Sequence, residues 1–312
     1  MKKNTKHITL RVIILAFILF CIGICLPRNA IELNLNDSYD ENINVNTTNG
    51  TTLLIHFFDI GQADSIFIQE PSGKTMLIDA GNEDDSSYII QYLKYMDINE
   101  IDYLVATHPH EDHIGGMDDI VTAFNVGMIL APKVLNNSQS NKDLHKAINK
   151  KEYTITYTKA GDHYNLGECN FTIASPWRDT YTNLNDYSLV LKLNYYKNSF
   201  LFMGDAEGDV LGDMLSAEVS LESDLIKIGH HGAAPSTPDK LIKAVKAKTA
   251  ILTVRNNKPN YPHLSTLSTL ENNHVDIYQT AGQGTVVVSS DGKNIHVSRS
   301  KIINKDKASL KK

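Results

Sequence analysis

The sequence predicts an α/β domain in which two β-sheets lie between layers of helices. Apolar, β-prone runs alternate with helical patterns along ~250 residues, a length that suits one large domain. The β-runs fall into two groups, and no internal repeat divides the chain. Together these observations favour two sheets packed against each other with helices on both outer faces.

The N-terminal segment carries a basic flank followed by an apolar run. Four bases stand within the first eleven residues, and residues 12–27 carry no charge. This pattern is typical of a secretory signal peptide or an uncleaved membrane anchor. Because no small-x-small cleavage site is evident at its end, we expect residues 1–27 to form a transmembrane anchor, with a signal peptide as the alternative. We therefore expect a cell-membrane protein with an extracytoplasmic domain, or alternatively a secreted one.

The remaining boundaries follow from composition. Residues 28–50 are rich in Asn and Asp with little apolar periodicity, which predicts a flexible linker. Thr51–Phe58 is expected to form the first strand, so the folded domain is predicted over residues 51–299. Residues 300–312 form a basic tail, expected to be a solvated end, or alternatively a membrane- or DNA-contacting one.

Within the domain, strands and helices are expected in alternation. Further strands are predicted at Ser65–Gln69, Thr75–Ile78, Asp102–Ala106, Cys169–Ala174, Ser188–Tyr195, Ser199–Met203, Asp224–Ile228, Thr249–Val254 and Thr285–Val288. Helices are predicted at Ser86–Met96, Gly116–Phe124, Lys142–Lys150, Ala206–Ala217, Pro238–Val245 and Leu264–Asn273.

Four potential metal ligands crowd into six positions after one of these strands. They are His108, His110, Asp112 and His113. Imidazole nitrogen and carboxylate oxygen suit zinc or a similar divalent ion. Pro109 and the glycines that follow resist a continuous helix, so the ligands are expected on a loop. In extended backbone His108 and His110 point the same way and could share one metal, which leaves Asp112 and His113 for a second.

This loop resembles the HxHxDH signature of the metallo-β-lactamase superfamily. Segments before it resemble the first strands and turns of that superfamily, and segments after it are similar to the hydrolase domain of ComEC-type DNA-uptake proteins. The resemblance covers roughly residues 52–298. It implies a four-layer αββα metallo-β-lactamase sandwich that uses two divalent metal ions, zinc or alternatively manganese. The segments that carry it are 58–65, 76–81, 185–190, 202–207 and 227–232.

Other ligands are expected further along the chain. Asp205 follows an apolar strand at a Gly turn, where it could bridge two cations or cap the next helix. His230 and His231 end a strand, and neighbouring side chains of extended backbone point to opposite faces. We therefore expect one ligand, His230, with His231 as a supporting or acid group. Asp79 is expected to orient a ligating imidazole, although a simple turn-forming role is possible.

One departure from the wider superfamily concerns the first metal. Many of its hydrolases carry a further His between the HxHxDH and Asp205 positions, whereas this chain has Asn185 to Ser188 there, as ComEC-type domains also do. The first metal site is thus expected to be weaker or more open, with Asn185 or Ser188 facing substrate.

Cysteine usage and charge limit the function further. Only Cys169 lies beyond the apolar N-terminal segment, so no disulfide can form within the domain, and we expect this Cys to be a small buried hydrophobe. Residues 1–30 hold five bases and no acid, so the rest carries 25 basic against 36 acidic residues. A net charge of −11 is unfavourable for holding nucleic acid by broad electrostatics, but metal ions, the His pair and Lys227, Arg255 and Lys258 could reverse the sign locally.

The sequence as a whole predicts an exported, membrane-anchored, metal-dependent hydrolase. The resemblance favours a phosphodiesterase or nuclease that uses a metal-activated water, with Asp112 and His231 in the chemistry and a phosphodiester such as DNA as substrate. One alternative is a lactone, β-lactam or choline-phosphate ester hydrolase with the same metals. Another is a non-catalytic, metal-stabilised wall- or DNA-binding module.

Overall fold

The computed structural model describes residues 52–217, 219–256, 258–281 and 284–300. The expected anchor, the linker and the basic tail after residue 300 lie outside these residues. Among the residues that are described, no helix is long and apolar enough to cross a membrane.

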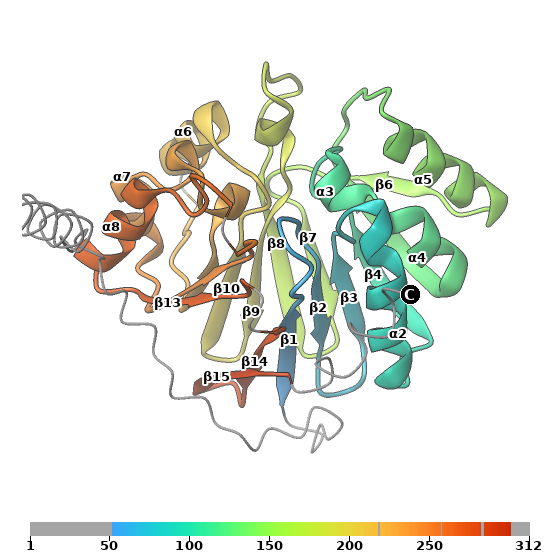
Figure 1. The fold of residues 1–312 in the computed structure, drawn as a ribbon, viewed down its shortest axis with the longest axis horizontal. Helices are drawn as coiled ribbons and strands as arrows, with labels where there is room; N and C mark the ends of the chain where they lie inside the picture. The colour runs from blue at the N-terminus through green and yellow to red at the C-terminus, as the bar shows by residue number, and fades with distance from the viewer. Residues whose placement is uncertain (1–51, 218, 257, 282–283, 301–312) are drawn as a thin grey trace, which may run out of the picture. The chain divides into compact units, whose positions relative to one another are not determined.

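Two β-sheets form the centre of the domain (Figure 1). The first sheet contains, in spatial order, β15 (Ile295–Arg299), β14 (Val286–Ser290), β1 (Leu53–Phe57), β2 (Ile66–Gln69), β3 (Thr75–Ile78), β4 (Glu100–Val105), β5 (Asn125–Ala131) and β6 (Ile155–Tyr157). The second contains β13 (Asp276–Gln279), β12 (Thr249–Leu252), β11 (Leu225–Lys227), β10 (Asn198–Phe202), β9 (Val190–Tyr195), β8 (Cys169–Ser175) and β7 (His163–Leu166).

Each sheet combines an antiparallel and a parallel part. In the first, the strands from β15 to β3 pair antiparallel and those from β3 to β6 pair parallel. In the second, β7 to β10 are antiparallel and β10 to β13 are parallel. Loops that follow parallel strands leave a sheet at the same edge, which is where ligands bind in open α/β sheets.

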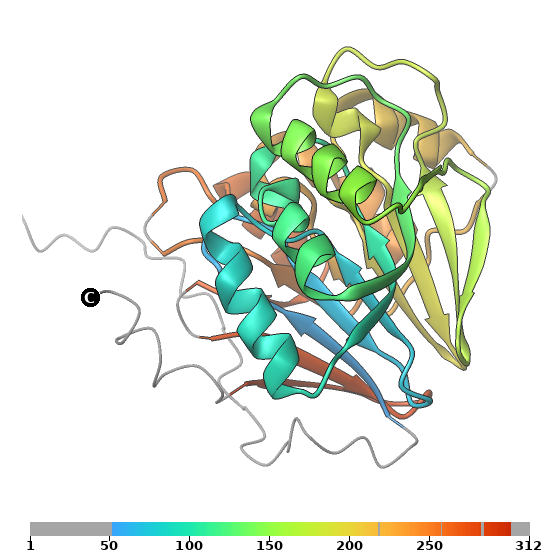
Figure 2. The same cartoon turned by 90° about the vertical axis from the view of Figure 1, so that its right-hand side faces the viewer.

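Helices cover the outer face of each sheet, and Figure 2 shows those of the first half in front of its strands. The first sheet carries α2 (Ser86–Tyr95), α3 (Glu111–Ile114), α4 (Met117–Ala123) and α5 (Gln139–Lys150). The second carries α6 (Gly208–Ser216), α7 (Asp239–Val245) and α8 (Leu264–Asn272). The predicted four-layer αββα architecture is confirmed.

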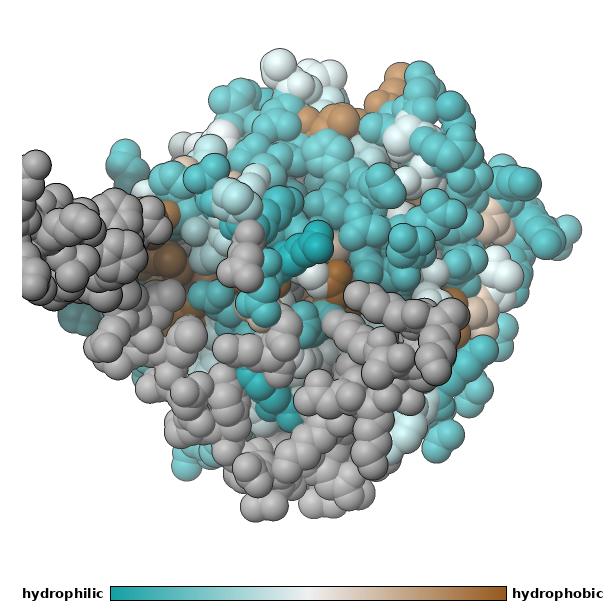
Figure 3. All heavy atoms as spheres, viewed as in Figure 1, coloured by the Kyte–Doolittle hydropathy of each residue, from teal (hydrophilic) through white to brown (hydrophobic). Residues whose placement is uncertain are grey.

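Two hydrophobic cores hold these layers together. Between the sheets, side chains of both inner faces are buried, and the rings of Phe57 and Phe202 lie 6.2 Å apart. A second core packs Leu93 and Ile120 of the helices against the outer face of the first sheet. Each such side chain contributes about 1.5–3 kcal/mol when fully buried. The view in Figure 3 shows a mostly hydrophilic surface with small apolar patches.

Most predicted elements form within one or two residues of their predicted ends, but several were missed. Strands β6, β7 and β15 are short or half exposed and carry too few buried side chains to give a clear pattern, and β5 contains Gly127. The metal-ligand loop also contains one helical turn, α3, which begins after His110 and ends at Gly115. Cys169 is buried and forms no disulfide within the described residues.

Candidate metal centre

The candidate ligands meet at one edge of the two sheets because each follows a parallel strand. Asp79 follows β3, the His108–His113 loop follows β4, and Asp205 follows β10. His230 and His231 follow β11 in the short helical turn η3 (Gly229–Gly232). Segments far apart in the sequence therefore place their polar side chains together, as expected for the carboxyl ends of parallel strands.

The structure arranges these side chains in two donor groups that share one carboxylate. The first group is His108, His110 and Asp205, and the second is Asp112, His113, Asp205 and His231. Within each group the donor atoms lie within 4.8 Å of one another. His108 Nε2 is 3.8 Å and His113 Nε2 is 3.2 Å from the Asp205 carboxylate. A carboxylate shared by two sets of donors suits a pair of neighbouring divalent ions.

The unpaired atoms of the second group fit a cation. Within the described residues, His113 Nε2 and Asp205 Oδ1 are buried and make no hydrogen bond, although they face each other. The Nδ1 atoms of His113 and His231 lie 2.7 Å from Asp79 Oδ2 and 2.8 Å from the Thr253 carbonyl oxygen, to which they can donate. In that tautomer each Nε2 directs its lone pair toward the centre of the group, where the two imidazoles could bind a cation.

Asp79 holds the second group in place. Besides His113, its carboxylate accepts hydrogen bonds from the backbone N–H and the hydroxyl of Thr107, at 2.8 and 2.7 Å. Asp79 itself has a positive φ of 59°, a conformation that carboxyl and amide side chains tolerate better than most. The sequence-based expectation placed Asp79 behind a ligating imidazole, and the structure puts it against His113.

Burial and neighbouring charges shift the pKa values of the buried groups of the site in different directions. Burial alone would lower the pKa of His113, but Asp205 and Asp79 on either side raise that pKa well above its usual range. Burial and the neighbouring His113 lower the pKa of His108 well below its usual range. Burial opposes the charge of Asp205, yet the surrounding imidazoles hold its pKa well below the ordinary value. The centre thus keeps an ionised carboxylate surrounded by imidazoles, which favours a bound cation.

A buried network supports His231 from behind. Lys227 is fully buried and donates to Asp64 Oδ2 at 2.6 Å. The other oxygen of Asp64 accepts a hydrogen bond from the Thr253 hydroxyl and lies 3.5 Å from His231 Nδ1. Lys227 was expected to add positive charge near a substrate. Its charge is instead engaged by a carboxylate inside the protein, which corrects that expectation.

The His230–His231 pair differs from the sequence-based expectation. Both residues have positive φ values, 46° and 51°, so they are not extended backbone and do not simply point to opposite faces. His231 is buried, and its Nε2 lies 3.3 Å from Asp112 Oδ2. His230 Nδ1 pairs with Glu207 Oε2 at 2.8 Å, and its Nε2 is 3.9 Å from Asp205. The geometry therefore groups His231, rather than the expected His230, with the other donors.

Asn185 and Ser188 lie close to the centre but are engaged by the protein. Asn185 donates to Glu207 Oε1 at 2.9 Å, although its own Oδ1 is buried and has no hydrogen bond within the described part of the chain. The Ser188 hydroxyl accepts from the backbone N–H of Asp205 at 3.0 Å. Ser188 is fully buried, so it positions Asp205 instead of facing substrate.

Two glycines allow the ligand loop to pack closely. A Cβ atom at Gly115 would lie 2.6 Å from the backbone N of Glu83, and one at Gly116 would lie 2.6 Å from the Ala80 carbonyl oxygen. Only glycine permits this approach of the loop to the segment that follows β3. This contact helps to fix the end of the ligand loop beside Asp79.

Sequence reasoning missed the supporting residues Thr107, Glu207 and Asp64. A lysine inside an otherwise apolar strand was a usable signal, because Lys227 must find a buried carboxylate. Glu207 stands two residues after Asp205, but nothing local indicated that it would pair with His230. Such partners depend on tertiary contacts between residues 23 to 163 positions apart.

Comparison with known proteins places this geometry in a family. The sequence profile described as the metallo-beta-lactamase superfamily matches residues 58–253. The chain belongs to the metallo-β-lactamase superfamily. Its fold is that of a metal-dependent hydrolase, and the His/Asp cluster is the place where this fold uses divalent metals. The predicted resemblance to the superfamily is confirmed.

Similar sequences support the ComEC-type resemblance. The chain is 26% identical over 206 residues to ComE operon protein 3 of Bacillus subtilis, a match that covers 61% of this chain and 26% of that protein. It is 27% identical over 198 residues to Recombination protein 2 of Haemophilus influenzae, covering 62% of this chain and 23% of that protein. The chain thus spans about a quarter of the length of these relatives.

Among solved structures, the metallo-beta-lactamase fold protein YhfI from Bacillus subtilis resembles the chain with a TM-score of 0.53. The match covers 77% of this chain and 99% of that protein, at 12% sequence identity. At this level of identity the likeness supports the fold alone.

Proposed function

We propose that the protein hydrolyses phosphodiester bonds, with nucleic acid as the preferred substrate class. The observation that carries the proposal is the single carboxylate, Asp205, shared by two adjacent donor groups. Two cations side by side suit displacement at phosphorus, because both the attacking and the leaving oxygen gain negative charge. The resemblance of the segments around Asp205 and His231 to ComEC-type domains supports the same class.

In this proposal, His108, His110 and Asp205 would hold one divalent ion, and Asp112, His113, His231 and Asp205 would hold the other. Zinc is the expected metal, with manganese as the alternative. The bound ions would supply an activated water and electrostatic stabilisation of the developing negative charge. Asp79 would keep the His113 ring oriented so that its Nε2 faces the centre.

His230 would donate a proton to the leaving group. Its Nδ1 is held by Glu207, its Nε2 faces the Asp205 carboxylate, and its side chain is 25% exposed. A proton at Nε2 could therefore reach an oxygen that leaves from the substrate. The sequence suggested His231 for this role, but His231 is buried among the ligand atoms.

The test compares substrates and metal content in the same preparation. The metal-loaded full chain should hydrolyse bis-p-nitrophenyl phosphate and cleave single-stranded DNA, and a chelator should stop both reactions. Asp205→Ala is the matched inactive control. Turnover of nitrocefin or a simple lactone with no phosphodiester cleavage would favour the alternative hydrolases, and bound metal without any turnover would favour a binding module.

The proposal also includes the location of the hydrolase domain in the cell. The basic flank and apolar run before residue 28 support a membrane anchor with the hydrolase domain outside the cytoplasm. Protease added to intact cells should then remove the domain. Protection of the domain, while an external marker protein is digested, would contradict this topology.

A further inference from the structure

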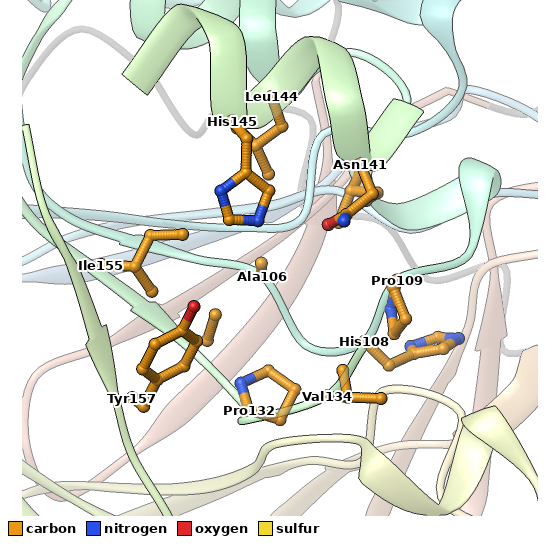
Figure 4. A pocket seen from close by; sticks show the side chains of 12 residues that line it. Ala106, His108, Pro109, Pro132, Val134, Asn141, Leu144, His145, Ile155 and Tyr157 are labelled. Atoms are coloured by element: carbon orange, nitrogen blue, oxygen red, sulfur yellow. The ribbon is translucent and has the colours of Figure 1, made fainter. Parts of the chain in front are cut away.

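A pocket lies beside the metal-ligand loop, on the side of the first donor group (Figure 4). It has a volume of about 390 Å³, counting the part that is open to solvent. Its walls come from the ligand loop, the end of β5 and the loop after it, α5 and β6. The lining residues used below are His108, Pro109, Val134, Leu144, His145 and Tyr157.

The pocket adjoins the candidate metal centre through one shared residue. His108 belongs to the pocket wall, and its imidazole is also a donor of the first group. A ligand in the pocket would therefore be separated from that centre only by the His108 side chain. This proximity suits the part of a substrate that adjoins the bond to be cleaved.

The lining suits a flat, weakly polar ring. Pro109, Val134 and Leu144 provide apolar surface, and Tyr157 and His145 present aromatic rings that face the same space in Figure 4. The Tyr157 side chain is 53% exposed, so its ring is available for stacking. Leu135, next to Val134, is 99% exposed and adds further apolar surface on the same loop. Aromatic and apolar faces of this kind bind nucleobases with little dependence on sequence.

The charge around the pocket is opposite to that of the rest of the domain. The segment 131–160, which supplies most of the lining, contains six Lys and two acidic residues, whereas the whole chain has a net charge of −6. On the other side of the site, Asp209 and Asp213 of α6 pair with Arg178, and Glu207 pairs with His230. A polyanion would therefore be attracted most strongly to the α5 side. The six are Lys133, Lys142, Lys146, Lys150, Lys151 and Lys159.

We propose that this pocket is a nucleobase subsite, which takes the base next to the scissile phosphodiester of a single-stranded polynucleotide. The lysines of segment 131–160 attract the flanking phosphates. This inference rests on the proposed function and deepens it, because it assigns a direction to the substrate: the strand leaves the metal centre across α5. An unpaired strand is required, since a base inside a duplex could not enter the pocket.

The experiment measures binding to the full chain by fluorescence anisotropy at low ionic strength, with chelator present so that nothing is cleaved. One probe is a labelled oligothymidylate, and the other is an abasic oligomer of the same length. Stacking on one aromatic ring should make the thymidylate bind about five- to tenfold more tightly than the abasic probe. Tyr157→Ala and His145→Ala should each remove most of that preference.

Two matched controls separate the subsite from general effects. Tyr95→Ala removes a similarly exposed tyrosine (58%) from α2 and should leave the preference unchanged. Lys146→Glu should weaken binding of both probes by a similar factor, while Lys240→Glu on α7 should not. Thermal unfolding of each variant checks that the fold persists.

Equal binding of the two probes to the unmodified protein would overturn the inference. So would a base preference that survives in both the Tyr157 and the His145 variant. Failure of the proposed function is recognised separately, because the metal-loaded protein would then leave bis-p-nitrophenyl phosphate intact whatever the oligonucleotides do.

Discussion

The two donor groups differ in how completely the protein builds them. The second has four donors, and its two imidazoles are each held from behind, His113 by Asp79 and His231 by the Thr253 carbonyl oxygen. The first has three donors, and His110 is only partly buried. Asn185, which lies close to the centre, donates to Glu207 and adds no imidazole to the first group. A donor that is already oriented loses less freedom on binding, so the second group should bind its ion more tightly.

In the proposed function, the three-donor group is the one that faces substrate. The proposed nucleobase pocket shares His108 with the three-donor group, while the four-donor group is backed by the buried Lys227–Asp64 pair. The four-donor side is thus the more rigid one, and we propose that substrate reaches the centre from the other side.

Asp205→Ala should remove the feature that the two groups share. Loss of the bridging carboxylate should release both ions and reduce hydrolysis by at least about a thousandfold, since several kcal/mol of charge stabilisation disappear. Elemental analysis and turnover of bis-p-nitrophenyl phosphate measure the two effects. Retention of both ions would show that the groups are independent.

Lys227→Met should lower the stability of the folded protein by disturbing the side of the four-donor group. The substitution leaves Asp64 buried without its partner, which typically costs about 3–5 kcal/mol. Urea unfolding of the metal-free chain measures the loss. The double variant Lys227→Met with Asp64→Leu removes both charges and should recover much of the stability. If the single and double variants are equally unstable, the ion pair is not the cause.

His231→Ala and His230→Ala form a matched pair, because the residues are neighbours in one turn. His231→Ala should lower the affinity for one ion by about a hundredfold or more, the upper range for disturbed metal sites. His230→Ala should keep both ions and lose turnover, mainly in kcat, if it serves the leaving group. The opposite result would restore the assignment that the sequence suggested.

The sequence could predict those parts of the site that depend on neighbouring residues, but not those that depend on contacts between residues far apart in the chain. The crowded His108–His113 loop and the apolar strand before it are local, so the ligands and their place at a strand end could be read directly. The choice between His230 and His231 could not, since it depends on positive φ values within η3 and on Glu207 and Thr253. The two-sheet fold was predictable from strongly apolar strands such as β1, while half-exposed edge strands such as β7 were not.

Asn185→His is expected to have the smallest effect and is the sharpest test of the comparison. Asn185 lies beside Glu207 and His230, and its buried Oδ1 makes no hydrogen bond within the described residues. An imidazole there could add a donor to the three-donor group and should raise its affinity for the ion about tenfold. Metal titration against a competing chelator should show the weaker of two binding steps become stronger, with the tighter step unchanged. Asn185→Ala is the control and should leave the weaker step as it is or weaken it slightly. If only the tighter step responds, Asn185 belongs to the four-donor side, and the contrast between an open and a rigid group would have to be reversed.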